Sequence, residues 1–278
     1  MPVIPIADLR DPRVDVFRDL PTAHLTRYSG LFIAEGEKLV RRLAESDYAV
    51  RSVLAEEPFV ELALSIVGDR APIYVVSREA LVELVSFKFH RGLLACGERK
   101  PPLGVDAFIE TAPPMATFVA AAHVCDPENL GGILRNAAAF GIDGVLIGRG
   151  SADPFSRRVL RVSMGTAFRL RIAYSQDLAA DLAALREKAG FETIGALLSP
   201  DAEQLETAAC GPRRVLVVGN EGHGLPPEVA AACSRKVCLP MAPGVDSLNV
   251  SVASGVFLYH FTRIGGRSDA SSLALKGA

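Results

Sequence analysis

One arginine of this 278-residue chain lies among side chains that would normally exclude a charge. Arg135 follows Ile133 and precedes Ala137, and the apolar spacing of this stretch predicts a helix. A guanidinium stays charged, so burying it is costly unless it is paired. A buried ion pair with Glu221, which lies in a glycine-rich segment, is one interpretation. The same cation could instead stabilise negative charge on a bound molecule.

A second set of polar residues precedes the last predicted helix. Ser247 stands at the position of an N-cap, Asn249 follows it, and Leu248 and Val252 begin an apolar helical face. The start of a helix exposes backbone N–H groups and partial positive charge, so it can hold a ligand. An ordinary core helix capped by serine would show the same residues. This segment alone therefore leaves both interpretations open.

Three segments share one arrangement, in which an apolar strand ends in a turn rich in Pro, Gly or Asn. They cover residues 117–141, 215–227 and 236–259. Across the chain, strands alternate with helices, which predicts right-handed βαβ units and a mostly parallel sheet. The predicted fold class is therefore α/β. A ligand is expected at the carboxyl edge of such a sheet.

The same patterns give approximate positions for the regular elements. Strands are predicted at residues 31–34, 50–55, 73–76, 92–96, 117–124, 144–147, 168–172, 191–197, 214–218 and 237–239. Helices are predicted at residues 37–44, 59–67, 79–85, 130–140, 155–162, 178–188, 228–233 and 248–262.

Two proline pairs, at 101–102 and 113–114, predict a stiff linker over residues 101–116. The linker would separate a small α/β domain at residues 1–100 from a larger domain at residues 117–266. Residues 267–278 are rich in Ser, Gly and Ala, and we expect them to form a flexible tail.

Taken together, the three strand–turn segments resemble the three motifs of the SpoU (TrmH-like) family of RNA 2′-O-ribose methyltransferases, in the SPOUT superfamily. The matching pieces are N-x-G-x-x-x-R-N-x-x-x-F-G at Asn129–Gly141, V-x-G-N-E-G-x-G at Val217–Gly224, and L-P-M followed by S-L-N-V-S-V-A within Leu239–Ala253. The resemblance implies a SPOUT methyltransferase domain whose last third forms a deep trefoil knot. It also implies transfer of a methyl group from S-adenosyl-L-methionine to a ribose 2′-OH.

The resemblance also implies a role for individual residues. The expected cofactor-binding residues are Gly219, Asn220, Leu239, Met241 and Leu248. The expected catalytic residues are Asn129, Arg135, Glu221, Ser247 and Asn249. In the family the matching arginine is proposed to activate the ribose hydroxyl. Because a guanidinium has a pKa above about 12, we favour Arg135 as a residue that fixes the phosphate and stabilises the developing alkoxide.

Residues 32–40 resemble the start of the substrate-binding domain that precedes many SpoU catalytic domains, which itself resembles ribosomal proteins that bind RNA. This resemblance makes residues 1–100 the expected RNA-binding domain and favours rRNA over tRNA as the substrate. It also implies a homodimer through the catalytic domain. The final helix, 248–262, carries more apolar residues than one core-facing stripe needs.

The composition sets limits on the partners of the chain. The net charge of −2 gives no general attraction to nucleic acid, so an RNA-binding surface must be local. Five cysteines without a C-x-x-C pair indicate reduced thiols, and no metal is expected. The chain shows neither a signal-peptide pattern nor an apolar run of membrane length, so we expect a cytoplasmic location without membrane association.

Two other functions keep the same fold and stay open: a tRNA 2′-O-methyltransferase, and a non-catalytic RNA-binding or assembly factor. The complete set of polar motif residues argues against the second. A dinucleotide- or nucleotide-dependent enzyme would need G-x-G-x-x-G or G-x-x-x-x-G-K-[ST], and a serine hydrolase would need G-x-S-x-G; the sequence has none of these at the expected places.

Overall fold

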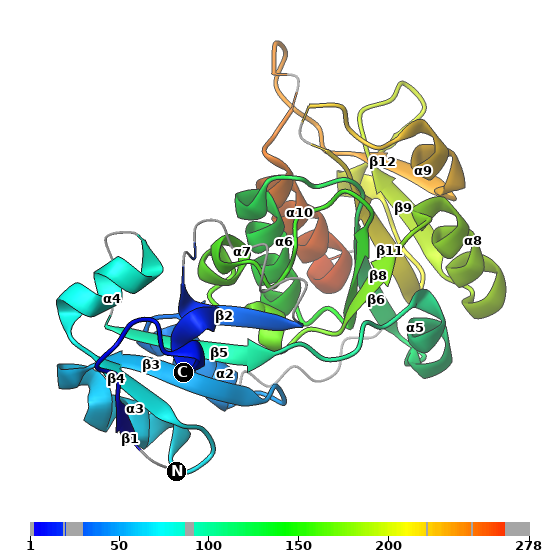
Figure 1. Cartoon of the computed structure of the whole chain (residues 1–278). Helices are drawn as coiled ribbons and strands as arrows, with labels where there is room; N and C mark the ends of the chain where they lie inside the picture. Colours follow the sequence, from blue (N-terminus) through cyan, green and yellow to red (C-terminus); the bar gives the residue numbers. More distant parts are fainter. Residues whose placement is uncertain are drawn as a thin grey trace. The chain divides into compact units, whose positions relative to one another are not determined.

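The computed structural model of the chain describes residues 3–18, 20, 30–86, 92–220, 222–245 and 247–264. The chain forms two compact units of the α/β class (Figure 1). Unit 1 comprises Met1–Pro102 together with Ala152–Leu170. Unit 2 comprises Leu103–Ser151 together with Arg171–Ala278.

Unit 1 contains a mixed five-stranded sheet in the order β1-β4-β3-β5-β2. β1 and β3 run parallel to β4, whereas β5 is antiparallel to β3 and β2. Its strands are β1 (Val3–Pro5), β2 (Leu31–Glu35), β3 (Val50–Glu56), β4 (Ile73–Val76) and β5 (Leu93–Glu98). Its helices are η1 (Pro12–Phe17), α2 (Glu37–Ala44), η3 (Glu57–Phe59), α3 (Val60–Val67), α4 (Arg78–Val85), α7 (Arg157–Val162) and η4 (Thr166–Phe168).

The segment that carries α7 belongs to unit 1 although it interrupts the sequence of unit 2. Arg99 forms a two-pronged ion pair with Asp153, at 2.9 Å (Nη1–Oδ1) and 2.6 Å (Nη2–Oδ2). Phe155 packs against Phe32 and Tyr48, with ring centroids 5.2 Å and 5.4 Å apart. Both the charges and the rings are largely buried, so this segment is an integral part of unit 1.

Unit 2 contains a seven-stranded sheet in the order β10-β12-β9-β11-β6-β7-β8, in which every pair of neighbours is parallel. Its strands are β6 (Ala116–Ala121), β7 (Gly144–Gly148), β8 (Ile172–Ser175), β9 (Glu192–Ala196), β10 (Glu203–Gln204), β11 (Arg213–Val218) and β12 (Arg235–Cys238). Its helices are α5 (Val105–Thr111), α6 (Pro127–Ala139), α8 (Leu178–Ala189), η5 (Leu205–Thr207), α9 (Pro227–Ala232), α10 (Val250–Tyr259) and a π-helical turn, His260–Ile264.

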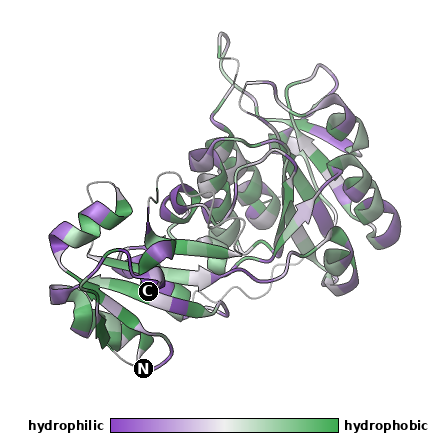
Figure 2. Ribbon diagram, in the orientation of Figure 1, coloured by the Kyte–Doolittle hydropathy of each residue, from purple (hydrophilic) through white to green (hydrophobic). Residues whose placement is uncertain are grey.

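The helices of unit 2 cover both faces of its sheet. Figure 1 shows α5, α8 and α9 on one face and α6 and α10 on the other. β6, β7 and β11 are almost entirely buried, as expected for the centre of a parallel sheet, and Figure 2 shows their apolar composition. The α/β class and the mostly parallel sheet are thus confirmed. The trefoil knot implied by the resemblance stays a prediction.

The sequence patterns located most elements within a few residues, with informative exceptions. The strand predicted at 168–172 is wrong for most of its length, because η4 follows Gly165 (φ 75°) and β8 begins only at Ile172. Within the residues predicted to be a linker lies α5, whose Phe108 is fully buried in the core of unit 2. β1 is also absent from the prediction. The predicted tail, 267–278, lies outside the described residues.

Candidate functional site

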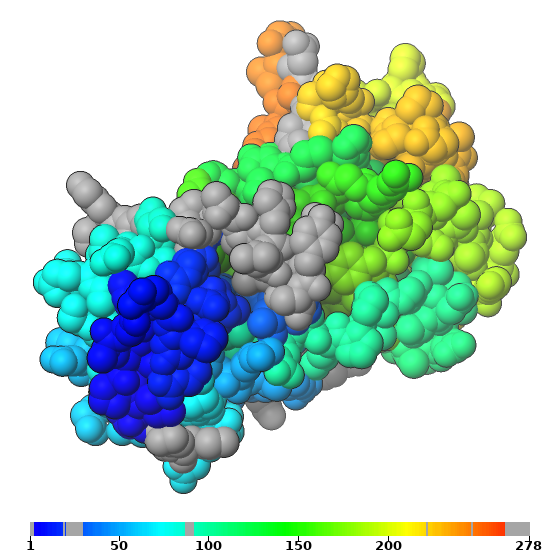
Figure 3. Space-filling model, viewed as in Figure 1, coloured from blue at the N-terminus to red at the C-terminus, as the bar shows by residue number. Residues whose placement is uncertain are grey.

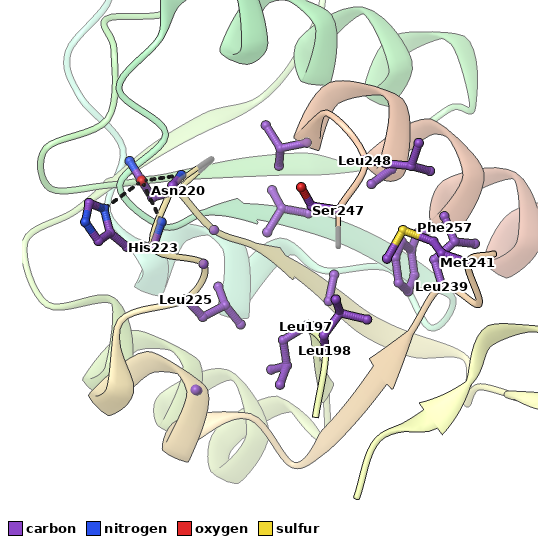
Figure 4. Close-up of a pocket in the computed structure, with 18 residues that line it drawn as sticks. Leu197, Leu198, Asn220, His223, Leu225, Leu239, Met241, Ser247, Leu248 and Phe257 are labelled. Atoms are coloured by element: carbon purple, nitrogen blue, oxygen red, sulfur yellow. Dashed lines mark hydrogen bonds between the residues drawn. The ribbon is translucent and has the colours of Figure 1, made fainter. Parts of the chain in front are cut away.

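A cavity of about 520 Å³ opens at the carboxyl ends of β9, β11 and β12 (Figure 4). It is lined by all five residues predicted to bind the cofactor and by one predicted catalytic residue. These are Gly219, Asn220, Leu239, Met241, Leu248 and Ser247. The residues come from two loops, one after β11 and one between β12 and α10, which the parallel sheet brings to a single edge. This volume and mostly apolar lining are typical of a site for a small organic molecule.

The two ends of the cavity differ in chemical character. Figure 4 shows Leu239, Met241 and Phe257 together at one end, and Asn220 and His223 at the other. Apolar contacts and a few polar groups are therefore available to different parts of a ligand. Such a distribution gives a bound molecule one orientation.

The loop after β11 requires a glycine at position 219 for an internal reason. A Cβ at Gly219 would lie 2.4 Å from the carbonyl carbon and oxygen of Gly224. The loop closes on itself because Asn220 and Gly224 exchange two backbone hydrogen bonds, at 2.8 Å and 2.9 Å. Gly219 therefore shapes the wall of the cavity before any ligand approaches it.

The side chain of Asn220 fixes this loop on both sides. Its Oδ1 accepts hydrogen bonds from the backbone N–H groups of Gly222 (2.9 Å) and His223 (3.1 Å). Its Nδ2 donates to the carbonyl oxygen of His123 at 3.1 Å, in the loop after β6. Asn220 thereby links the cavity to the loop that leads into α6. Glu221, predicted to be catalytic, lies outside the described residues.

Asn249, and not Ser247, is the N-cap of α10. The Oδ1 of Asn249 accepts from the backbone N–H of Ser251 (2.9 Å) and of Val252 (3.3 Å). The expectation that Ser247 caps the helix is therefore wrong, because α10 begins two residues later than predicted. Ser247 instead lines the cavity, where Figure 4 shows its hydroxyl group.

Asn129 and Asn249 are brought together across two helices. Asn249 Nδ2 donates to Asn129 Oδ1 at 2.7 Å. Asn129 is 7% exposed and lies inside α6, whose N-cap is Asp126. Asn129, which stands at the turn before the predicted helix and could have been its N-cap, therefore does not cap α6. A buried carboxamide held by a second carboxamide has a fixed orientation, which suits a group that positions a substrate.

A second contact locks α6 against α10 two turns further along. Asn136 Nδ2 donates to the carbonyl oxygen of Ser251 (2.6 Å) and to Ser254 Oγ (3.1 Å). The helices approach closely at Gly132, where a Cβ would lie 2.6 Å from the Cβ of Ser251. The relative position of the two helices is therefore fixed by the hydrogen bonds of Asn136 as well as by apolar packing.

Arg135 is exposed on α6, so the interpretation of a buried arginine is wrong, while a pairing with Glu221 lies outside the described residues. The physical reason is helical geometry: Arg135 is offset by about 100° from Asn136, which faces α10. Within the part of the chain that the structure describes, Arg135 forms no hydrogen bond or ion pair. It does not line the cavity. Its guanidinium is thus available to a ligand that arrives from solvent.

One wall of the cavity was not predicted. Ala196, Leu197 and Leu198, at and beyond the end of β9, line it, and the side chain of Leu198 is 59% exposed. The Ser199–Pro200 turn directly after this strand was the signal in the sequence that could have located this wall.

Behind this wall the Sγ of Cys233 packs near Gly195, and burial raises the pKa of the Cys233 thiol to about 11. That thiol stays protonated at neutral pH and therefore inert.

Two negative observations apply to the described residues only. They contain no group of three or more His, Cys, Asp or Glu side chains that could hold a metal ion. None of their helices is both long enough and apolar enough to cross a membrane.

Comparison with known proteins assigns the fold and the motifs to one family. Residues 116–259 match the model of the SpoU rRNA Methylase family. An uncharacterized tRNA/rRNA methyltransferase of Mycobacterium bovis is 35% identical over 268 residues, which cover 94% of this chain and 92% of that protein. The 23S rRNA (guanosine-2′-O-)-methyltransferase of Acinetobacter baylyi is 30% identical over 190 residues, or 67% of this chain and 76% of that one.

The solved structures agree. The crystal structure of an AdoMet-bound rRNA methyltransferase from Sinorhizobium meliloti superposes with a TM-score of 0.81 at 26% identity. The match covers 93% of this chain and 97% of the other. The fold, the cavity at the carboxyl edge and the three motifs, two of which line that cavity, have one common explanation: the chain belongs to the SpoU rRNA methylase family, whose members are RNA methyltransferases.

Proposed function

We propose that this protein transfers a methyl group from S-adenosyl-L-methionine to a ribose 2′-hydroxyl of ribosomal RNA. The observation that carries the proposal is the cavity that the second and third motif loops line, beside the hydrogen-bonded pair Asn129 and Asn249. The bound S-adenosyl-L-methionine supplies an electrophilic methyl group. Everything else in the reaction must come from this chain: an enclosed place for the donor, a positioned hydroxyl, and stabilisation of an oxyanion.

The residues of the cavity fit this cofactor. The turn at Gly219 leaves backbone groups close to the cavity without an intervening side chain. Leu239, Met241 and Leu248 supply an apolar surface for a flat heterocycle, and Asn220 adds polar groups at the opposite end. A molecule that is part aromatic and part charged matches this division.

The polar residues next to the cavity would act on the RNA. Asn129, oriented by Asn249, would hold the ribose. Arg135, exposed and unpaired among the described residues, would bind the adjacent phosphate and stabilise the 2′-alkoxide as its proton passes to water. The ribose oxygen would then take the methyl group, and S-adenosyl-L-homocysteine would leave. We also assign Ser247 and Glu221 to the active site on the basis of the motifs. Ser247 is supported by its place in the cavity lining.

A ribosomal substrate is favoured by the presence of unit 1. A separate unit can select the RNA while methyl transfer takes place in unit 2. The Acinetobacter baylyi relative is named for 23S rRNA, whereas the Mycobacterium bovis relative is named for tRNA or rRNA. We therefore propose rRNA as the substrate. We also propose a cytoplasmic location. tRNA remains the second candidate.

A homodimer through unit 2 is part of the proposal. Val252, Val256 and Tyr259 are exposed by 53%, 39% and 52%, and they lie on one side of α10 at helical spacing. A second copy of the chain would cover this apolar stripe in a two-fold interface. Arg135 belongs to the neighbouring helix α6, so the same interface would bring it near the partner's cavity.

One experiment tests the proposal in two steps. Isothermal titration of S-adenosyl-L-methionine into the purified protein should show one site per chain. Ribosomal RNA and tRNA from a strain that lacks the gene should then be incubated with the protein and the cofactor, and 2′-O-methyl groups mapped by limited alkaline hydrolysis. A new protected ribose in rRNA is expected. Binding without methylation of either RNA would support the non-catalytic alternative, and methylation of tRNA alone would change the substrate.

A further inference from the structure

The loops that follow β6 and β7 pack against each other outside the cavity. β6 and β7 are adjacent and parallel, with Ala121 opposite Ile147. Beyond the ends of both strands, the ring of His123 packs on Gly150, which Arg149 directly precedes. Both His123 and Arg149 are exposed. The carboxyl edge of the sheet thus carries an imidazole and a guanidinium on two neighbouring loops.

His123 is held in an uncommon conformation. Its φ is +59°, a left-handed conformation that only a few per cent of residues other than glycine adopt, histidine more often than most. Its ring packs on Gly150 so closely that a Cβ there would lie 2.6 Å from His123 Cδ2 and 2.8 Å from Nε2. Gly150 itself has φ +80°. The imidazole therefore has a defined place at the surface, because the backbone beneath it carries no side chain.

Several hydrogen bonds fix the two loops to each other. Ser151 Oγ donates to the carbonyl oxygen of Ala121 (3.1 Å) and accepts from the backbone N–H of Val124 (3.0 Å). Cys125 Sγ lies 3.4 Å from the carbonyl oxygen of Gly150. The carbonyl oxygen of His123 receives Asn220 Nδ2, as described above. Several contacts therefore hold the strained residue His123 in place, as is common at functional positions.

The charges of this surface favour an anionic, aromatic ligand. Arg149 makes no hydrogen bond or ion pair within the described ranges of the chain. The acidic residue nearest to His123 in the sequence, Asp126, accepts a hydrogen bond from the N–H of Glu128 (2.9 Å) as the N-cap of α6. The acidic residue nearest to Arg149, Asp153, is paired with Arg99. An exposed ring held in place beside a free guanidinium can stack a base and bind its phosphate.

We propose that His123 and Arg149 bind a single-stranded nucleotide of the RNA next to the one that is methylated. The imidazole of His123 stacks on the base, and Arg149 pairs with the phosphate. This assignment rests on the proposed function, since it deepens the substrate contacts of the same site. The two residues lie outside the three motifs. Stacking on His123 requires that this nucleotide is unpaired when the RNA is bound.

The test uses two fluorescently labelled 12-residue probes, oligo(A) RNA and an abasic ribose-phosphate strand, with the full-length protein saturated with S-adenosyl-L-methionine. His123→Asn tolerates positive φ but lacks the ring, so it should weaken oligo(A) binding roughly 5- to 100-fold and leave binding of the abasic strand unchanged. His123→Gly should behave in the same way. Arg149→Ala should weaken both probes and reduce the slope of log Kd against log[salt] by about 0.7.

Lys188→Ala is the matched control, because it removes one exposed positive charge at the end of α8, at the opposite edge of the sheet. It should change neither probe. Wild-type binding of oligo(A) by His123→Asn, equal losses for both probes, or no oligo(A) binding by the wild-type protein would each overturn the inference. Failure of the proposed function is distinguished separately, since it would abolish cofactor binding or rRNA methylation by the wild-type protein.

Discussion

Asn249 caps α10 with its carboxamide oxygen and holds Asn129 with its carboxamide nitrogen, at 2.7 Å. One side chain therefore joins the start of a helix to a buried polar group on another helix. Because an amide has a distinct acceptor and donor, the two contacts fix which end of the group faces which partner. The capping role contributes to stability, and the contact with Asn129 is expected to contribute to activity.

Asn249→Ser and Asn249→Ala separate these two roles. Serine is a good N-cap but too short to reach Asn129, so the serine variant should keep the stability that comes from the cap and lose most of its activity. Alanine loses both contacts and should cost about 1 kcal/mol of unfolding free energy in addition. Thermal melts and single-turnover methylation measure the two effects. An active serine variant would remove the contact with Asn129 from the mechanism.

Arg135→Ala should abolish methyl transfer and leave cofactor affinity unchanged, because Arg135 does not line the cavity. Its exposure means that stability should change by no more than about 0.5 kcal/mol. Arg135→Lys keeps the charge but not the planar fork, so its activity should also fall strongly. Calorimetry and methylation assays decide the matter. Substantial turnover by the alanine variant would contradict this role.

Gly219→Ala should lose cofactor binding because its Cβ would collide with the backbone of Gly224, at 2.4 Å. The loop itself must shift, so the effect does not need direct contact with the cofactor. Gly104→Ala is the control, since nothing lies within 4 Å of its Cβ and its φ is −92°. Titration of both variants with S-adenosyl-L-methionine should show a loss in the first alone. Equal affinities would show that the loop tolerates the added group.

Asp153→Asn should destabilise unit 1 by about 3 kcal/mol, because it removes the negative charge of a largely buried, two-pronged ion pair with Arg99. Asp47→Asn removes a carboxylate that is 96% exposed and 3.8 Å from Lys100, so it should cost less than about 1 kcal/mol. Urea unfolding compares the two.

A fragment that begins at Met115 leaves Phe155 without the rings of Phe32 and Tyr48, so deletion of residues 1–114 is not a neutral test of RNA selection.

Val256→Asp should convert a dimer into monomers and reduce activity, because it places a charge in the exposed stripe of α10. Met115→Asp introduces the same charge at another apolar side chain of unit 2, which is 64% exposed. This control should stay associated and active. Sedimentation velocity at micromolar concentration gives the answer. A fully active monomeric wild-type protein would refute the proposed dimer.

The sequence was sufficient for much of the fold and for the cavity. Apolar periodicity located β11 and α8 to within a residue, and the motif loops at Gly219 and Leu239 do meet. Local patterns failed where distant contacts decide. Arg135 lies in an apolar stretch, but only the packing of α6 on α10 shows that it faces solvent.

Capping residues and unit membership show the same limit. Ser247 and Asn249 are both good caps, and the backbone conformation alone selects Asn249. The assignment of residues 152–170 to unit 1 depends on Arg99 and Phe32, which precede that segment by more than fifty residues. No local pattern contains such information.

All residues that line the cavity lie in the last third of the chain, from Ala196 to Phe257. During synthesis the ribosome therefore releases unit 1 and β6 to β8 long before a cofactor site can exist. A chain interrupted before β12 would keep the first sheet and would have no methyl-donor site. If unit 1 binds RNA as proposed, nascent or truncated molecules should engage RNA without modifying it, and the order of the chain would separate recognition from chemistry in time.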